Sequence, residues 1–259
     1  MQEKKIIVSR ADITASCRAI HKPGEYTILP PGNRVFSNIP GLVGAETEVL
    51  AGPQIGANFI QYKVNLHENG GTETWLEQEY EQFIFINKGG LTLEYQNKKH
   101  QMKEGGFCWL PPHSSFRFLN KDNDTSEFIW IRRLYEEVPG IKIPDAIISN
   151  EKDVAAEPVD TYMEQHLTPY EDLGFDMGIN IQKFDPGSYF SFVESHIMEH
   201  GLYMLYGNGI YWLNQDYIEV EKDAFIYMAP YCPQFFFTLG WDKAAYLLYK
   251  DVNRDLKLK

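Results

Sequence analysis

Short apolar runs with the composition of β-strands recur along most of the chain. They are rich in Tyr, Phe, Ile and Val, and Gly, Pro, Asn and Asp separate them at intervals of roughly 8–12 residues. Typical runs are FIQYKVNL, QFIFINKG, LTLEYQN, SEFIWIRRL, GIYWLN and AAYLLYK. Sustained helical spacing of apolar residues is missing from the sequence. The pattern predicts an all-β chain folded as a sandwich or a barrel.

The second half of the chain repeats the first half at a constant offset of 118 positions. Without a gap, EGGFCWLPPHSSFRF (104–118) aligns with KDAFIYMAPYCPQFF (222–236). The aligned pairs include Gly89 with Gly207, Phe107 with Phe225, Pro112 with Pro230 and Phe118 with Phe236. A constant offset indicates two copies of one module. We predict modules at 1–140 and 141–259, and expect the N-terminal 50 residues to pair with the other half.

One polar cluster interrupts the apolar pattern of the second copy. Residues 194–200 read ESHIMEH, and four ionisable groups this close are costly to bury unless something pairs them. A helix is the alternative, but the aromatic and β-branched flanks and the glycines nearby favour a strand over 194–200, which puts Glu194, His196 and His200 on one face. Their counterparts in the first copy are Leu76, Gln78 and Gln82. The comparison predicts a metal site in the second module and loss of its ligands from the first.

The spacing of these residues resembles the motifs of the cupin family. The first motif is matched by Glu194-x-His196-x3-His200-x6-Gly207, and the second by a proline in APYCPQ followed by Gln234. The resemblance implies a bicupin of two jelly-roll β-barrel modules, with Glu194, His196, His200 and Gln234 as metal ligands. Two imidazoles, a carboxylate and an amide oxygen suit Mn(II), Fe(II), Ni(II) or Zn(II).

Longer stretches narrow the resemblance to the (S)-ureidoglycine aminohydrolase family of bicupins. They include QIGANFIQYKVNLHENGG, LGFDMGINIQKFDPG, ESHIMEHGLYMLYGNGIY and YKDVNRD. The resemblance implies Mn(II) as cofactor and hydrolysis of (S)-ureidoglycine to (S)-ureidoglycolate and ammonia, a step of allantoin and purine catabolism. It also implies substrate or proton-handling roles for Tyr211, Tyr246 and Lys250. For a further family glutamate the two candidates are Glu136 and Glu137.

Composition and charge exclude several other classes of function. The formal net charge of −12 is unfavourable for nucleic acids and anionic membrane surfaces, because phosphate contacts need a basic surface. The sequence shows neither a signal peptide nor a membrane span. Three dispersed cysteines, Cys17, Cys108 and Cys232, suit free thiols in a reducing cytoplasm. We therefore expect a cytoplasmic homo-oligomer with a small-molecule substrate.

Two alternative functions remain for a chain of this kind. One is another cupin metalloenzyme, such as a dioxygenase, although the Gln234 ligand disfavours a three-histidine or two-histidine-one-carboxylate centre. The other is a small-molecule binder without catalysis. A binder predicts that both copies have lost their ligands, whereas the second copy retains a full set.

Overall fold

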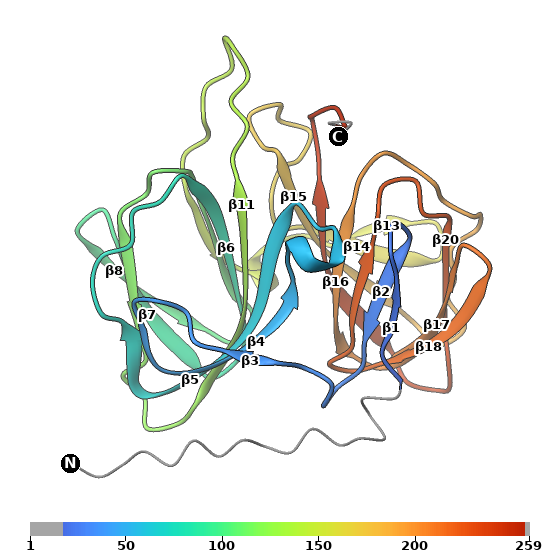
Figure 1. Cartoon of the computed structure of the whole chain (residues 1–259), viewed down its shortest axis with the longest axis horizontal. Coiled ribbons are helices and arrows are strands. Elements are labelled where there is room, and N and C mark those ends of the chain that lie inside the picture. The colour runs from blue at the N-terminus through green and yellow to red at the C-terminus, as the bar shows by residue number, and fades with distance from the viewer. Residues whose placement is uncertain (1–17, 257–259) are drawn as a thin grey trace.

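The computed structural model describes residues 18–256, and strands make up most of this part of the chain (Figure 1). Its only helices, among the described residues, are two short 3-10 turns, η1 (Pro53–Ile55) and η2 (Glu151–Asp153). The prediction of an all-β chain is confirmed. Cys17 and the two ends of the predicted modules lie outside the described residues. No helix between residues 18 and 256 is long and apolar enough to cross a membrane.

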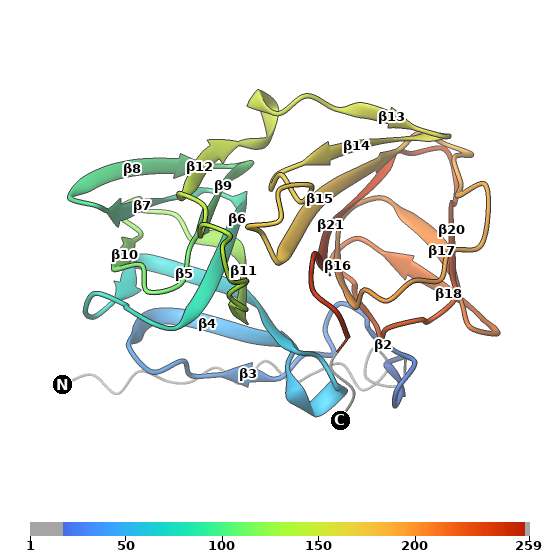
Figure 2. The same ribbon diagram turned by 90° about the horizontal axis from the view of Figure 1, so that it is seen from above.

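The first module is one antiparallel sheet of ten strands that curls around an apolar interior (Figure 2). Its main path runs β12-β9-β6-β11-β5-β10-β7-β8, with β4 also on β5 and β3 on β4. The strands are β3 (Phe36–Ser37), β4 (Leu42–Ala51), β5 (Phe59–Thr72), β6 (Tyr80–Lys88), β7 (Gly90–Tyr95), β8 (Lys98–Lys103), β9 (Gly106–Leu110), β10 (Phe116–Leu119), β11 (Ser126–Leu134) and β12 (Ile147–Asn150).

The second module packs an eight-stranded sheet against a three-stranded one. The larger sheet has the order β1-β2-β19-β16-β21-β15-β14-β13, and the smaller has the order β18-β17-β20. The strands are β1 (Ile20–Lys22), β2 (Tyr26–Leu29), β13 (Glu157–Val159), β14 (Tyr162–His166), β15 (Met177–Phe184), β16 (His200–Tyr206), β17 (Asn208–Leu213), β18 (Asp216–Glu221), β19 (Phe225–Met228), β20 (Gln234–Thr238) and β21 (Ala244–Asp251). Apolar side chains of both sheets fill the space between them.

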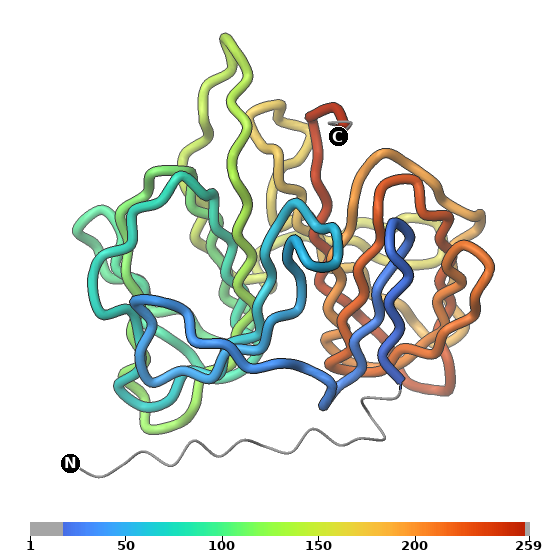
Figure 3. The backbone as a smooth tube through the Cα atoms, viewed as in Figure 1, coloured from blue at the N-terminus to red at the C-terminus, as the bar shows by residue number. Residues whose placement is uncertain are grey.

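Each module includes a strand from the segment that precedes the other module in sequence. β2 pairs with β19 of the second module, as predicted, but the rest of the N-terminal 50 residues does not follow the prediction, because β3 and β4 pair within the first module. β12 pairs with β9 of the first module. Figure 3 shows the blue chain crossing from the right-hand module to the left-hand one after this hairpin. Strand pairing therefore crosses the 140/141 boundary in both directions, and that boundary stays a prediction.

The backbone repeats the 118-residue offset seen in the sequence. β7 and β17 occupy corresponding positions, as do β8 and β18. Left-handed backbone conformations also recur in pairs at this offset. They fall at Gly89 and Gly207, Gln96 and Asn214, Gly105 and Asp223, and His113 and Tyr231. The repeat is therefore a repeat of backbone conformation as well as of side-chain type.

A second apolar core lies between the two modules. Along β6, Ile84 and Ile86 point into the first barrel, while Phe83 and Phe85 join the core shared with the second module. Because successive strand residues point to opposite faces, a sheet buried on both faces has a nearly continuous apolar sequence. This explains runs such as QFIFIN, in which apolar and polar residues do not alternate.

Buried acidic side chains gather at one edge of this shared core. Glu81 is fully buried, and its Oε2 accepts a hydrogen bond from Trp109 Nε1 at 2.7 Å. Burial, followed by the neighbouring Asp176, raises the pKa of Glu81 well above the ordinary glutamate value of 4.5, and Arg133 offsets this only in part. The folded protein therefore binds a proton at Glu81 more tightly than the unfolded chain does.

We predict that Glu81→Gln stabilises the protein increasingly as pH rises. A carboxyl group whose pKa is raised by folding contributes most stability when protonated. That contribution is lost as pH rises from the unfolded value, near 4.5, through the folded value. Glutamine can still accept from Trp109 and cannot ionise. The difference in melting temperature between variant and wild type should grow between pH 5 and pH 8. The exposed Glu79→Gln is the control, and a pH-independent difference would contradict the prediction.

Candidate metal centre

The four predicted ligands converge at one end of the second barrel, although not on one strand. β16 begins only at His200, so the predicted strand over 194–200 is wrong for most of its length. Glu194 instead forms an isolated antiparallel bridge with Gln234, with both backbone hydrogen bonds at 2.9 Å. The backbone carbonyl of His196 accepts from Tyr231 N at 2.7 Å. These bonds fix the loop that carries Glu194 and His196 against the start of β20.

The distances between the donor atoms fit a common ion. His196 Nε2 lies 3.1 Å from His200 Nε2 and 3.0 Å from the Gln234 side-chain amide. Two ligands at right angles, each about 2.1 Å from one ion, are roughly 3 Å apart. The oxygen and nitrogen of a glutamine amide are assigned from hydrogen bonding, so a turn of the amide presents Gln234 oxygen to the same point.

Glu194 is the least closely placed of the four donors. Its Oε2 lies 4.0 Å from His196 Nε2. In residues 18–256, no three His, Cys, Asp or Glu side chains are already gathered at ion-binding distance. The Glu194 side chain is 29% exposed, so packing does not enclose it fully, and it stays a candidate ligand beside the other three.

Both histidines are held in the form that binds metals. Burial lowers the pKa of His196, and the positive charge of Lys250 lowers it further. Burial also lowers the pKa of His200 well below its usual value, with added effects of His196 and Lys250. A neutral imidazole offers a lone pair to a metal, whereas a protonated one does not. The residues present therefore fit a divalent metal with mixed nitrogen and oxygen ligands.

A pocket of about 390 Å³ opens beside these donors. Lys250 lies in its wall, and its Nζ is 4.1 Å from the centre of the Tyr170 ring. Burial lowers the pKa of Lys250, and the carboxylates Glu164 and Glu194 oppose that shift. Lys250 is thus placed where it can hold or transfer a proton beside the candidate metal ligands.

The two predicted site tyrosines lie behind the pocket wall. Tyr211 and Tyr246 are buried in the apolar core of the second barrel, with ring centres 6.1 Å apart. The Tyr246 hydroxyl donates to Gln182 Oε1, and Gln182 does line the pocket. Neither tyrosine is among the lining residues, and neither are Glu136 and Glu137. Tyr246 therefore reaches the pocket through Gln182.

Several lining residues were missed by the sequence analysis. Glu164 and Gln182 lie on the neighbouring strands β14 and β15, and Tyr170 follows β14. That analysis named no candidate site residue between Glu137 and Glu194. The alternation of Tyr162, Glu164 and His166 along β14 was the available signal, because such residues share one face of a strand.

The corresponding place in the first barrel is filled by protein side chains. Leu76 and Phe116 form the bridge that matches Glu194 and Gln234. Gln82 Nε2 donates to Gln78 Oε1 at 3.3 Å, in place of the histidine pair. Arg132, the counterpart of Lys250, also donates to Gln78 Oε1. An internal guanidinium thus supplies positive charge at the place where the second barrel gathers the candidate metal ligands.

We predict that Arg132→Met destabilises the protein without changing metal binding. Arg132 packs between the Tyr80 and Trp130 rings, 4.9 and 5.2 Å from their centres, and its loss leaves Gln78 without its charged donor. Breaking such a buried contact costs about 1–3 kcal/mol. Urea unfolding measures the effect. Arg117→Met, which removes an ion pair nearer the surface, is the control. An equal loss in both variants would refute a special role for Arg132.

Comparison with known proteins identifies the family of this chain. A family model described as cupin domain matches residues 62–132, which lie in the first copy. An Escherichia coli protein named (S)-ureidoglycine aminohydrolase is 34% identical over 254 residues, covering 96% of each chain. The chain belongs to the (S)-ureidoglycine aminohydrolase family.

Further members and structures support the same family. A rice protein named probable (S)-ureidoglycine aminohydrolase is 33% identical, covering 94% of this chain and 78% of its own. The crystal structure of protein Ylba from E. coli superposes with a TM-score of 0.85 at 31% identity, covering 95% of this chain and 98% of the other. The predicted bicupin fold is confirmed.

Proposed function

We propose that the chain hydrolyses (S)-ureidoglycine to (S)-ureidoglycolate and ammonia, with Mn(II) held by Glu194, His196, His200 and Gln234. The observation that carries this proposal is the convergence of four nitrogen and oxygen donors beside Lys250, in a chain 34% identical to a protein of that name. A bound divalent ion would supply positive charge that anchors the substrate carboxylate and orients the reacting carbon.

The protein side chains supply the remaining steps. Water adds an oxygen to the carbon that carries both nitrogens, the bond to the amino nitrogen breaks, and this nitrogen leaves as ammonia. The departing nitrogen needs a proton, and the Lys250 ammonium can donate it because burial lowers its pKa; the proton that the attacking water gives up then restores the ammonium. The pocket has one ammonium on its wall and the carboxylates Glu164 and Glu194, so a small zwitterion is electrostatically complementary.

The proposal is tested with (S)-ureidoglycine generated in place from allantoate by its amidohydrolase. Protein stripped by a chelator and reloaded with Mn(II) should release ammonia, consume no oxygen and form (S)-ureidoglycolate in excess. Lys250→Met should keep the metal and lose about 10²–10⁴-fold in rate, the usual range for one proton-transfer group. The exposed Lys152→Met is the control. Ammonia release no faster than in buffer, with racemic product, would overturn the assignment.

A further inference from the structure

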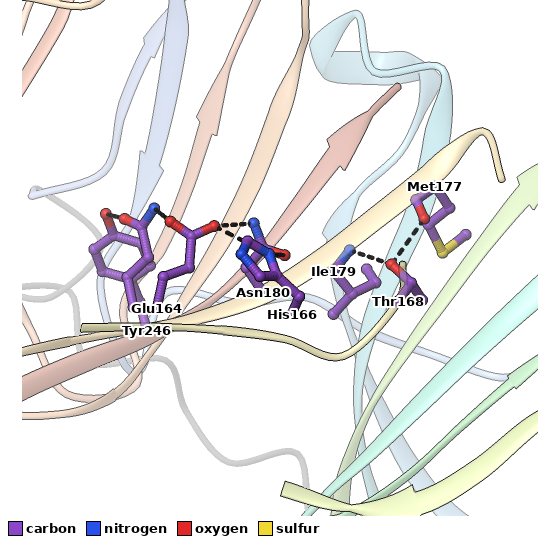
Figure 4. Close-up of polar contacts among 8 residues, drawn as sticks. Glu164, His166, Thr168, Met177, Ile179, Asn180 and Tyr246 are labelled. Carbon is purple, nitrogen blue, oxygen red and sulfur yellow. Dashed lines mark hydrogen bonds and ion pairs between the residues drawn. The ribbon is translucent and has the colours of Figure 1, made fainter. Parts of the chain in front are cut away.

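One wall of the pocket, formed by β14 and β15, carries an ordered carboxylate. Glu164 is only 6% exposed, yet it lines the pocket. Asn180 Nδ2 donates to its Oε1, and Gln182 Nε2 donates to its Oε2 at 3.1 Å (Figure 4). Each carboxylate oxygen has two lone pairs, so each can accept one more hydrogen bond. The side chain is therefore held in place and retains acceptor capacity.

The amides that hold Glu164 are themselves oriented. Tyr246 donates its hydroxyl proton to Gln182 Oε1, which leaves the Gln182 amide nitrogen facing Glu164. His166 Nδ1 lies 3.2 Å from Asn180 Oδ1, which leaves the Asn180 amide nitrogen facing Glu164. Glu164, Gln182 and Tyr246 are direct partners across β14, β15 and β21, so one row of the sheet carries the whole chain of contacts.

Among the described residues, only the His166 imidazole lies within ion-pairing distance of Glu164. His166 Nδ1 is 3.6 Å from its Oε1 but already faces Asn180. Lys250 interacts with Glu164 electrostatically, but in the described part of the chain its ammonium has no carboxylate within 4.0 Å. A buried carboxylate of this kind is stabilised by further N–H donors from a ligand.

We infer that Glu164 receives the ureido group of the substrate and selects for it. This inference rests on the proposed function, because that substrate supplies the ureido group. The two nitrogens of a ureido group present parallel N–H bonds on the side away from the carbonyl oxygen. A carboxylate accepts both in the forked geometry that it forms with a guanidinium. Tyr246 and Gln182 are then positioning residues, since they fix the acceptor without touching the substrate.

The inference is tested with two stable ligands of the Mn-loaded protein. N-carbamoylglycine and N-acetylglycine share a carboxylate and a planar amide and differ in a terminal NH2 or CH3. Wild type should bind N-carbamoylglycine roughly 10- to 100-fold more tightly, the range for hydrogen bonds to a charged acceptor. In Glu164→Gln that preference should vanish, because an amide nitrogen replaces one acceptor. Isothermal titration calorimetry gives the ratio of the two dissociation constants without turnover.

The matched control is Glu157→Gln, the same substitution at the exposed residue paired with Glu164 across β13 and β14. It should keep the wild-type ratio. Equal affinities in wild type, or an unchanged ratio in Glu164→Gln, would overturn the inference. If the glutamine variant does not fold, Glu164→Asp is the second test. The shorter side chain keeps the negative charge but moves it away from the ligand, so this variant must also lower the ratio. Wild-type protein that discriminates the ligands but releases no ammonia would sink the proposed function while still showing that this pocket selects a ureido group.

Discussion

Replacing His196 by alanine should abolish Mn(II) binding and reduce ammonia release by about 10²–10³-fold, the range for loss of one transition-state contact. His196 is the central donor of the set, because its Nε2 lies within 4.0 Å of Glu194, His200 and Gln234 alike. Without His196, the other three donors no longer share a neighbouring ligand, and the candidate site loses its central donor. Metal content after chelation and reloading with Mn(II) measures the effect directly.

The matched control for this prediction lies in the first barrel. Gln78 occupies the position equivalent to His196, and Gln78→Ala should leave both metal content and rate unchanged. Equal metal loss in the two variants would mean that the first barrel also contributes to metal binding. Zn(II) or Ni(II) acquired during purification can displace Mn(II), so both proteins need the same chelation step.

Residues 141–259 produced alone should neither fold nor bind metal. This fragment lacks β2, which pairs with β19, and exposes the apolar face of β15, β16 and β21 that packs on the first module. That face includes Ile179, Tyr203 and Tyr249, each fully buried in the whole chain. Exposing a face of this size removes much of the hydrophobic stabilisation. Circular dichroism and size-exclusion chromatography would detect the failure.

A cut made after folding is the control for this second prediction. Gly140 and Ile141 lie in an exposed connection. Cleavage at a protease site placed there breaks the covalent link between the two halves. Because the exchanged strands and the shared core remain in place, the nicked protein should stay assembled and keep its metal. A folded, metal-binding 141–259 fragment would show that each half is self-sufficient.

The all-β fold and the repeat could be predicted because each rests on a regular signal in the sequence. The constant offset identified Leu76 and Gln78 as counterparts of Glu194 and His196, and the matching isolated bridges confirm that alignment. Strand parity placed Glu194, His196 and His200 on one side, and all three line the pocket although β16 starts only at His200. Spacing was informative here because backbone hydrogen bonds of Glu194 and His196 fix this loop beside the start of β20.

The pocket wall that carries Glu164 could not be predicted in the same way. Glu164, Gln182 and Tyr246 become neighbours only through the pairing register of three strands that are distant in sequence. The pairing register of such distant strands cannot be inferred from a single sequence. Likewise, the resemblance that singled out Tyr246 indicated its identity but not its depth in the barrel, which depends on the packing around it.

The exchanged N-terminal strand also determines when the protein can complete its fold. Ile28 of β2 pairs with Ile226 of β19, 198 residues later in the chain. During synthesis β2 must therefore wait, with an unpaired edge, until most of the polypeptide has emerged. Contacts between such distant segments slow folding, and exposed strand edges favour association between chains. Partly synthesised or slowly refolding chains are accordingly the stage at which this protein most needs chaperone protection.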